Sequence, residues 1–246
     1  MKFLTLDQKG VFAAIILGCV LFVFGFLAVA VVPLRVVWGV AGGALFLITL
    51  FWFLLLSAIS TGFGKRMKTK LGLYEDYRGY KNVAANGLGP ALFAIITVVF
   101  GSSGHSVAYW AALVGFVTCV AAITSDKFSS EIGVMDGPPR MIFTFVKVKK
   151  GVSGGITRLG LVAGFAGAVL VSVLVLPFAL VFGIPQPVYA IVAVTIGGFV
   201  GTISDSMLGF YESRGIGNKH TSNFVSSIIG ALWGMALFML FIAIIH

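Results

Sequence analysis

Two carboxylates in one short polar stretch are candidates for a metal-binding or catalytic role. Asp126 and Glu131 fall within 124–133, beside several hydroxyl side chains, directly after an apolar run. Mg²⁺ prefers oxygen ligands, commonly one or two carboxylates completed by substrate phosphates. The stretch therefore indicates a magnesium site. The same sequence is also compatible with an acidic segment that caps a helix and faces lipid headgroups.

Asp205 is a third candidate because it lies near the end of the otherwise apolar run 188–210. An ionisable residue inside or beside a membrane-spanning segment marks a functional site by default. The alternative is a buried carboxylate paired with a lysine. Gly197 and Gly201, which precede it, are equally well explained as residues that let two helices pack closely.

Glycines and cations combine in the segment from Lys147 to Arg158, which ends where another apolar run begins. Glycines let backbone N–H groups approach a phosphate, and the following helix N-terminus would add a partial positive charge. The segment is not a Walker A loop, and a flexible turn with membrane-surface lysines is the plain alternative. Its candidate phosphate-binding residues are Lys147, Lys149, Lys150, Gly151, Ser153, Gly154, Gly155 and Arg158.

Asparagines open two of the apolar runs. Asn82 and Asn86 precede or begin the third run, and Asn223 begins the seventh. Asparagine at such a place is often a helix N-cap. A role as a ligand stays open for Asn86 and Asn223, because the predicted topology places both on the same face as the carboxylates.

The candidate residues lie at the ends of predicted membrane-spanning helices. Of the 246 residues, 59% are hydrophobic and 10% are charged, whereas a soluble domain has roughly 25% charged residues. About 20 apolar residues cross a bilayer as a helix, and the pattern predicts an all-α polytopic integral membrane protein with about seven transmembrane helices. The third run is short and contains Pro90, so we expect it to be tilted, kinked or re-entrant. The seven runs are 11–32, 35–60, 87–101, 106–124, 159–183, 188–210 and 223–245.

The distribution of basic residues predicts the orientation. With the N-terminus inside, the segments 61–86, 125–158 and 211–222 lie inside and carry most Lys and Arg residues, whereas the outer loops carry only Arg35. This positive-inside pattern predicts N-in, C-out, multi-pass in the cell membrane. All the candidate residues then share the cytoplasmic face.

Other classes of function find little support. The three histidines show no metal-binding spacing, and nothing suggests recognition of nucleic acid. The first run, 11–32, is longer than the apolar core of a cleaved signal peptide, so we expect it to remain. The chain has 17 Lys and Arg residues and 8 Asp and Glu residues. This basic character indicates anionic lipid or nucleotide phosphate as partners.

From about Ser57 to Gly230, the chain resembles a membrane protein family that includes plant phytyl-phosphate kinase and vertebrate transmembrane protein nineteen. That family is distantly similar to CTP-dependent lipid kinases and cytidylyltransferases. The resemblance suggests a single transmembrane domain over 1–246, in which an N-terminal helix within 1–34 precedes the family core 35–246. It rests on the motifs 82–87, 125–133, 151–160, 205–209 and 221–230.

The resemblance implies transfer of a phosphoryl group from CTP to a prenyl monophosphate, of phytyl or geranylgeranyl type, with Mg²⁺ as cofactor. It implies that Asn86, Asp126, Glu131 and Asp205 occupy motif positions. We expect Asp126 and Asp205 to bind the metal, with Glu131 as a third ligand or a base. The chain departs from the family pattern at Lys127, where Thr is usual, and at Ser153, where a carboxylate or amide is common.

Three other functions fit the same residues. A cytidylyltransferase would join CTP to a lipid phosphate and release pyrophosphate. A lipid or ion transporter would use the carboxylates for coupling ions, but its sites lie near the bilayer midplane. A non-catalytic scaffold would need none of them, and a homo-oligomer is compatible with every one of these functions.

Overall fold

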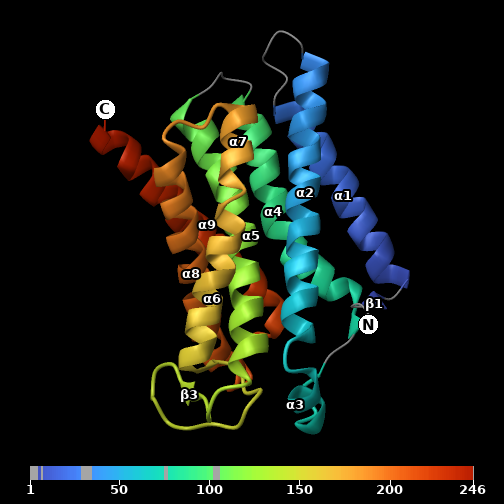
Figure 1. Ribbon diagram of the computed structural model, residues 1–246, viewed down its shortest axis with the longest axis vertical. Coiled ribbons are helices and arrows are strands. Elements are labelled where there is room, and N and C mark those ends of the chain that lie inside the picture. The colour runs from blue at the N-terminus through green and yellow to red at the C-terminus, as the bar shows by residue number, and fades with distance from the viewer. Residues whose placement is uncertain (1–4, 7, 29–34, 75–76, 102–105, 246) are drawn as a thin grey trace.

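The computed structural model describes residues 5–6, 8–28, 35–74, 77–101 and 106–245, which form a bundle of helices (Figure 1). Two short strand pairs accompany the helices: β1 (Thr5–Leu6) lies parallel to β2 (Tyr77–Arg78), and β3 (Arg140–Met141) lies antiparallel to β4 (Gly155–Ile156). The described helices are α1 (Gln8–Ala28), α2 (Arg35–Gly62), α3 (Lys65–Lys70), α4 (Tyr80–Gly101), α5 (Val107–Gly133), α6 (Arg158–Ser172), α7 (Val175–Phe182), α8 (Pro187–Glu212) and α9 (Lys219–Ile245).

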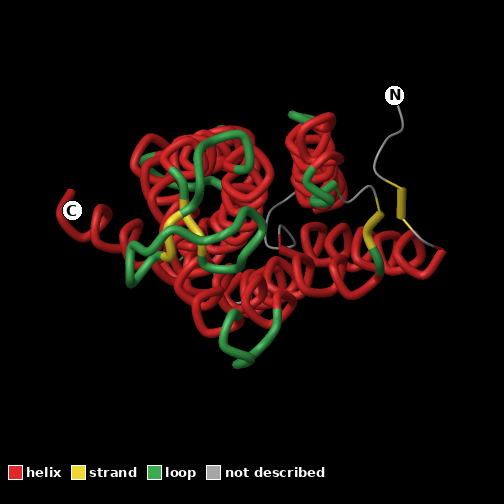
Figure 2. Tube along the Cα trace, turned by 90° about the horizontal axis from the view of Figure 1, so that it is seen from below, coloured by secondary structure: helices red, strands yellow, loops and turns green. Residues whose placement is uncertain are grey.

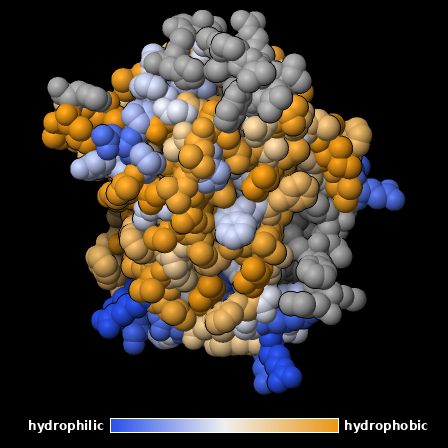
Figure 3. All heavy atoms as spheres, turned by 45° about the horizontal axis from the view of Figure 1, so that its top comes forward, coloured by the Kyte–Doolittle hydropathy of each residue, from blue (hydrophilic) through white to orange (hydrophobic). Residues whose placement is uncertain are grey.

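Seven spans of the described chain are long and apolar enough to cross a membrane, with α6 and α7 together making one of them. This confirms the predicted all-α, multi-pass membrane fold. The face in Figure 3 is mostly hydrophobic, and strongly hydrophilic groups gather mainly toward its lower edge. An apolar surface of this kind is what a bilayer requires, because lipid tails offer no hydrogen bonds.

Two spans differ from the sequence-based expectation. The third span is a 22-residue helix that starts at Tyr80, seven residues before the predicted start at 87, and Pro90 is buried inside it. The fifth span is two helices, because Pro177 lacks the N–H that would continue the ladder from α6, and a turn at Val173 and Leu174 separates α6 from α7.

α5 is the central helix of the bundle. Of its most apolar stretch, 83% is buried, against 50% or less in each of the other described spans. It contacts α2, α4, α6, α8 and α9. Small side chains allow this crowding: a Cβ added to Gly164 of α6 would lie 3.2 Å from Ser125 O.

The candidate residues gather at one end of the bundle, called here the motif end, where α2, α5 and α8 finish and α4, α6 and α9 begin (Figure 1). In Figure 2, seen from below, the loop with β3 and β4 lies over this end. α1 and α2 touch closely away from it: a Cβ added to Gly25 would lie 2.7 Å from Gly42 O. Toward the motif end, α1 diverges from α2 (Figure 1). The predicted outer loops 33–34 and 102–105 and two of the histidines, His105 and His246, lie outside the described residues.

Candidate functional site

Asp126 of α5 and Asp205 of α8 meet at the motif end. Their carboxyl groups lie within hydrogen-bonding distance of each other, and Ser226 of α9 donates a hydrogen bond to Asp205 Oδ1 at 3.2 Å. Two ionised carboxylates this close repel each other unless a shared proton or a bound cation lies between them. The pair is therefore suited to holding a cation.

The close packing of α5 on α8 brings the two aspartates together. A Cβ added to Gly201 would lie 2.5 Å from the Cβ of Ala122, so only glycine permits this approach of the helices. Beside this contact, the Thr202 hydroxyl donates a hydrogen bond to the Ser125 hydroxyl. Asp126 directly follows Ser125, and Asp205 lies about one turn beyond Thr202.

Glu131, one or two turns beyond Asp126 on α5, is held by two ammonium groups. Lys68 Nζ lies 2.8 Å from Glu131 Oε2, and Lys127 Nζ lies 2.8 Å from Glu131 Oε1. Lys68 is only 1% exposed and also donates to the carbonyls of Ser60 and Thr61, at 3.3 and 2.6 Å. The predicted role of Glu131 as a metal ligand or base stays a prediction, and the geometry gives it a second task, which is to hold Lys127.

The β3–β4 loop, residues 134–157, packs against α8 through two glycines, one in the loop and one in the helix. Gly154 has a φ of +81°, and a Cβ there would lie 2.5 Å from Phe210 N. A Cβ added to Gly209 would lie 2.5 Å from Gly154 N. No larger residue fits at either position without moving the backbone, so this contact holds the loop against the turn of α8 that follows Asp205.

Asp136 and Lys150 fix the other side of the same loop. Lys150 Nζ donates to the carbonyls of Val134 and Asp136, both at 2.7 Å. The Asp136 carboxylate accepts hydrogen bonds from Leu159 N at 3.0 Å and Gly137 N at 2.8 Å, and these N–H groups hold its pKa below the ordinary value. The α6 N-terminus, expected to face a phosphate, is therefore capped by Asp136 and by the Thr157 hydroxyl.

A polar cavity of about 230 Å³ lies between the loop and the helix ends. Both aspartates and Glu131 line it, together with part of the loop, so the structure brings eight of the predicted site residues into one hollow. Those eight are Asp126, Glu131, Lys150, Gly151, Ser153, Gly154, Gly155 and Asp205.

An apolar cavity adjoins the polar one. Its walls come from α1, α2, α4, α5 and the start of α9, and they include Leu17, Leu50, Phe53 and Val120. The two cavities share four lining residues, namely Asp126, Lys127, Ser130 and Lys219. A charged hollow and a hydrocarbon-lined hollow therefore meet at Asp126.

Asn86 and Asn223 line the apolar cavity close to this junction. Asn223 Nδ2 donates to Asn86 Oδ1 at 3.3 Å, so the pair joins α9 to α4. Neither residue is a helix N-cap: both lie inside helices, and Asn218 Oδ1 accepts from the N–H groups of His220 and Thr221 at the start of α9. The capping alternative is thus wrong for both, and a ligand role stays a prediction.

Three predicted cations are placed elsewhere. Lys147, Lys149 and Arg158 are exposed and line neither cavity. Their predicted contact with a phosphate is untested, and it would require the ligand to reach outside the polar hollow.

Three lysines of the site, Lys68, Lys127 and Lys219, were not predicted from the sequence. Lys219 begins α9 and lines both cavities, and Lys127 had been noted only as a departure from the family pattern. Lys68 lies beside Lys65 and Lys70 in the sequence, and nothing there distinguishes it from these exposed neighbours. The only sequence signal for Lys219 is its place two residues before the motif 221–230.

The residues present fit a magnesium ion that is bound together with phosphate. Among the described residues, no three His, Cys, Asp or Glu side chains converge as a ready-made metal cage. Two carboxylates suffice for Mg²⁺ when substrate phosphates and water complete its shell. Asp126 and Asp205 supply such a pair, and the hydroxyls of Ser129 and Ser206 line the same cavity.

Comparison with known proteins places the chain in a family. Residues 25–231 match the family model described as integral membrane protein DUF92. The chain belongs to the DUF92 family. The matched range holds every candidate site residue and every residue that lines the polar cavity.

Relatives of this DUF92 protein occur in archaea, plants and cyanobacteria. An uncharacterized membrane protein of Methanocaldococcus jannaschii, MJ0933, is 34% identical over 95% of this chain and 86% of its own length. Protein PGR of Arabidopsis thaliana is 30% identical over 68% of this chain and 62% of its own. An uncharacterized membrane protein of Synechocystis, sll0875, is 30% identical over 71% and 65%. No solved structure matches the chain.

Proposed function

We propose that this protein is a membrane prenyl-phosphate kinase, which transfers the γ-phosphoryl group of CTP to a prenyl monophosphate. The observation that carries the proposal is the junction of the two cavities at Asp126. A prenyl phosphate has one charged end and one long apolar chain, and the shared lining residues lie where these two parts would meet. CTP as the donor rests on the family resemblance.

The reaction moves one phosphoryl group. An oxygen of the prenyl monophosphate attacks the γ-phosphorus of CTP, and the bond from that phosphorus to the bridging β–γ oxygen breaks. The products are CDP and a prenyl diphosphate. Because this chemistry needs little from the protein beyond positioning and charge, a polar hollow with fixed cations and carboxylates is adequate for it.

Each group at the junction has a proposed task. Asp126 and Asp205 would hold the magnesium that accompanies the nucleotide, and the bound ion would supply positive charge to offset that of the phosphates. Lys127 and Lys219 attract the phosphates from the side shared by both cavities. Glu131 keeps the Lys127 ammonium in place through their 2.8 Å ion pair.

The loop completes the nucleotide side. Gly151, Ser153, Gly154 and Gly155 line the polar cavity, and we propose that their backbone N–H groups and the Ser153 hydroxyl contact the triphosphate. Lys150 supplies positive charge close by, while its ammonium also holds the carbonyls of Val134 and Asp136. In this scheme, lysine in place of the family's usual threonine at position 127 changes the contact with the phosphates and leaves the activity in place.

The test is an assay of CDP release in mild detergent with Mg²⁺, CTP and a prenyl monophosphate. We expect Asp126→Asn and Asp205→Asn each to lower turnover by about 100-fold or more, since each removes one carboxylate from the phosphate-bound cation. Lys70→Gln is the control, because Lys70 is exposed on α3 and lines neither cavity. Equal turnover in all three variants and the wild type would remove the aspartate pair from the reaction.

A further inference from the structure

The apolar cavity follows one face of α5. Its lining residues on this helix include Phe116, Val120, Ile123 and Asp126, which are spaced by four, three and three positions. Residues at these intervals lie above one another on a helix. The cavity therefore runs parallel to α5, with a carboxylate at one end and a phenyl ring at the other.

Its length follows from helix geometry. Ten residues separate Asp126 from Phe116 on an unbroken helix, and at about 1.5 Å per residue this is about 15 Å. An isoprene unit adds four carbon–carbon bonds to a chain, which advance roughly 5 Å when extended. The distance corresponds to about three isoprene units.

Aromatic rings close the far end. Phe116 is stacked on Phe46 with ring centroids 4.1 Å apart, and Phe178 and Phe182 pack behind them at 5.3 to 6.0 Å. All four side chains are at most 1% exposed. A chain that reaches Phe116 cannot continue along α5 without displacing this cluster.

Most of the side walls are hydrocarbon, and part of them comes from α1 and α2, which diverge toward the motif end (Figure 1). Ala14 and Leu17 of α1 and Leu50 and Phe53 of α2 line the cavity there. α1 also packs closely on α4, because a Cβ added to Gly87 of α4 would lie 2.4 Å from Leu17 Cδ2 of α1. Side chains of α1, α2 and α4 therefore face α5 across the cavity.

We propose that this cavity selects substrates by chain length, and that it accepts about three isoprene units between Asp126 and Phe116. The proposal rests on the proposed function, since it takes the chain to be that of a prenyl monophosphate. It makes Phe116 and Val120 the residues that determine specificity. Val120 is only 4% exposed and lies about 9 Å from Asp126 along the helix, or about two isoprene units.

The test measures binding without nucleotide, so that it does not depend on catalysis. Dissociation constants of radiolabelled geranyl, farnesyl and geranylgeranyl monophosphate are measured for the purified protein in detergent. We expect farnesyl monophosphate to bind several-fold more tightly than geranyl monophosphate, and the fourth unit of geranylgeranyl monophosphate to add nothing.

Two variants move the end of the cavity. Val120→Phe fills it at the third unit, so we expect affinity for farnesyl monophosphate to fall about tenfold, as for overpacking of one buried side chain, while affinity for geranyl monophosphate stays within about twofold. Phe116→Ala opens the far end and should make geranylgeranyl monophosphate the tightest ligand. Ile95→Phe is the control, because Ile95 lies on α4 with 41% of its surface exposed and outside the cavity lining.

The outcomes separate the two proposals. Affinity that does not depend on chain length in the wild type, or an unchanged farnesyl-to-geranyl ratio in a Val120→Phe protein that melts like the control, would overturn the length selection. Length-dependent binding without any CDP formation would leave the selection intact and remove the kinase. Phosphorylation with no preference among the three chains would support the kinase and overturn the length selection.

Discussion

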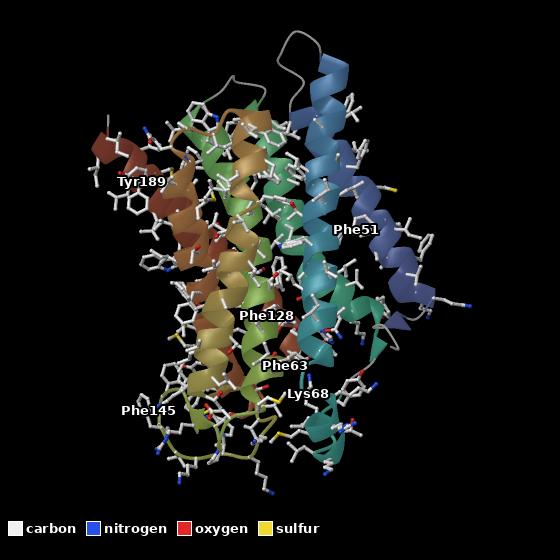
Figure 4. The ribbon with its side chains drawn as sticks, viewed as in Figure 1. Phe51, Phe63, Lys68, Phe128, Phe145 and Tyr189 are labelled. Carbon is white, nitrogen blue, oxygen red and sulfur yellow. The ribbon has the colours of Figure 1, made fainter. Side chains whose placement is uncertain are left out.

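The Lys68 ammonium sits in a setting unusual for its residue type, because lysine is almost never fully buried unless it is paired. Figure 4 shows it at the motif end of the bundle, near the end of α5. Its three N–H donors are matched by Glu131 and by the carbonyls of Ser60 and Thr61. Lys68 therefore ties α3 to α5 and, through Glu131, fixes Lys127 beside the cavity junction.

Removal of this ammonium is expected to destabilise the fold. We expect Lys68→Met to lower the free energy of unfolding by roughly 3 kcal/mol, since a buried ion pair loses one partner while Lys127 still neutralises Glu131. Lys70→Met, an exposed change on the same short helix, should stay within about 0.5 kcal/mol. Denaturation in mild detergent measures both, and a double variant with Glu131→Gln should cost less than the sum of the single changes. Strict additivity would mean that the two side chains do not act together.

At the residue scale, sequence reasoning found the carboxylates more readily than their partners. Asp126 and Asp205 stand out because charge is rare at the ends of apolar runs, so their type and place suffice. Lys68 lies among Lys65, Arg66 and Lys70, and nothing in that cluster distinguishes the one buried side chain from its exposed neighbours. The burial of Lys68 depends on the position of α3 against the ends of α2 and α5, and no local sequence pattern predicts that position.

At the scale of elements, the docking of the β3–β4 loop on α8 depends on the contact of Gly154 with Gly209. We expect Gly154→Ala to displace the loop and to lower turnover, because the added Cβ would meet the backbone of Phe210. Gly72→Ala is a matched control, since Gly72 also has a positive φ, +68°, but has nothing within 4 Å of the added Cβ. Limited proteolysis of the loop measures the displacement. Equal protection of the two variants would contradict the docking.

The cap of α6 predicts a pH dependence. The pKa of Asp136 is lowered in the folded state by the Leu159 and Gly137 N–H groups, so its charge stabilises the fold above the unfolded pKa of about 3.9. This stabilisation is lost as the pH falls through the folded-state pKa. We therefore expect the melting temperature of the wild type to exceed that of Asp136→Asn at neutral pH. This difference in melting temperature should disappear below about pH 4. A constant difference in melting temperature from pH 7 to pH 3 would show that the charge is not what matters.

Elements were predictable where hydropathy marks them and less so where geometry does. The long apolar runs gave the spans, whereas the polar first turns of α4, from Tyr80 to Asn86, hid its true start. The loop was predicted as a phosphate cradle from its glycines, but its contact with α8 was not. Gly209 carries no sign in the sequence that its partner is Gly154, 55 positions earlier.

At the scale of the whole molecule, the predicted orientation is open to a direct test. The positive-inside pattern places the 134–157 loop in the cytoplasm and the turn at Gln186 outside. With Cys19 and Cys119 replaced by alanine, we expect Gln186→Cys to react with an impermeant maleimide in intact cells. Lys149→Cys should react only after the cells are permeabilised. Both positions are exposed in the structure, so the reverse pattern would mean the opposite orientation.

The arrangement of the helices explains why the whole site could be only partly predicted. A one-sided gathering of polar residues follows from the topology of seven spans. The central place of α5, and the apolar cavity between it and α1, α2 and α4, depend on which helices pair. That pairing follows from contacts such as Gly201 with Ala122 and Gly87 with Leu17, each between residues far apart in the chain.

Phosphoryl transfer at the Asp126–Asp205 pair can be tested by following the position of a radioactive label. The purified protein is given Mg²⁺, a prenyl monophosphate and CTP labelled either in its γ- or in its α-phosphate. We predict that γ-label appears in a prenyl diphosphate made by the wild type and that Asp205→Asn makes almost none. Label from the α-phosphate in the lipid would instead indicate a cytidylyltransferase, and no label in the lipid from either CTP, in folded protein, would contradict catalysis at this site.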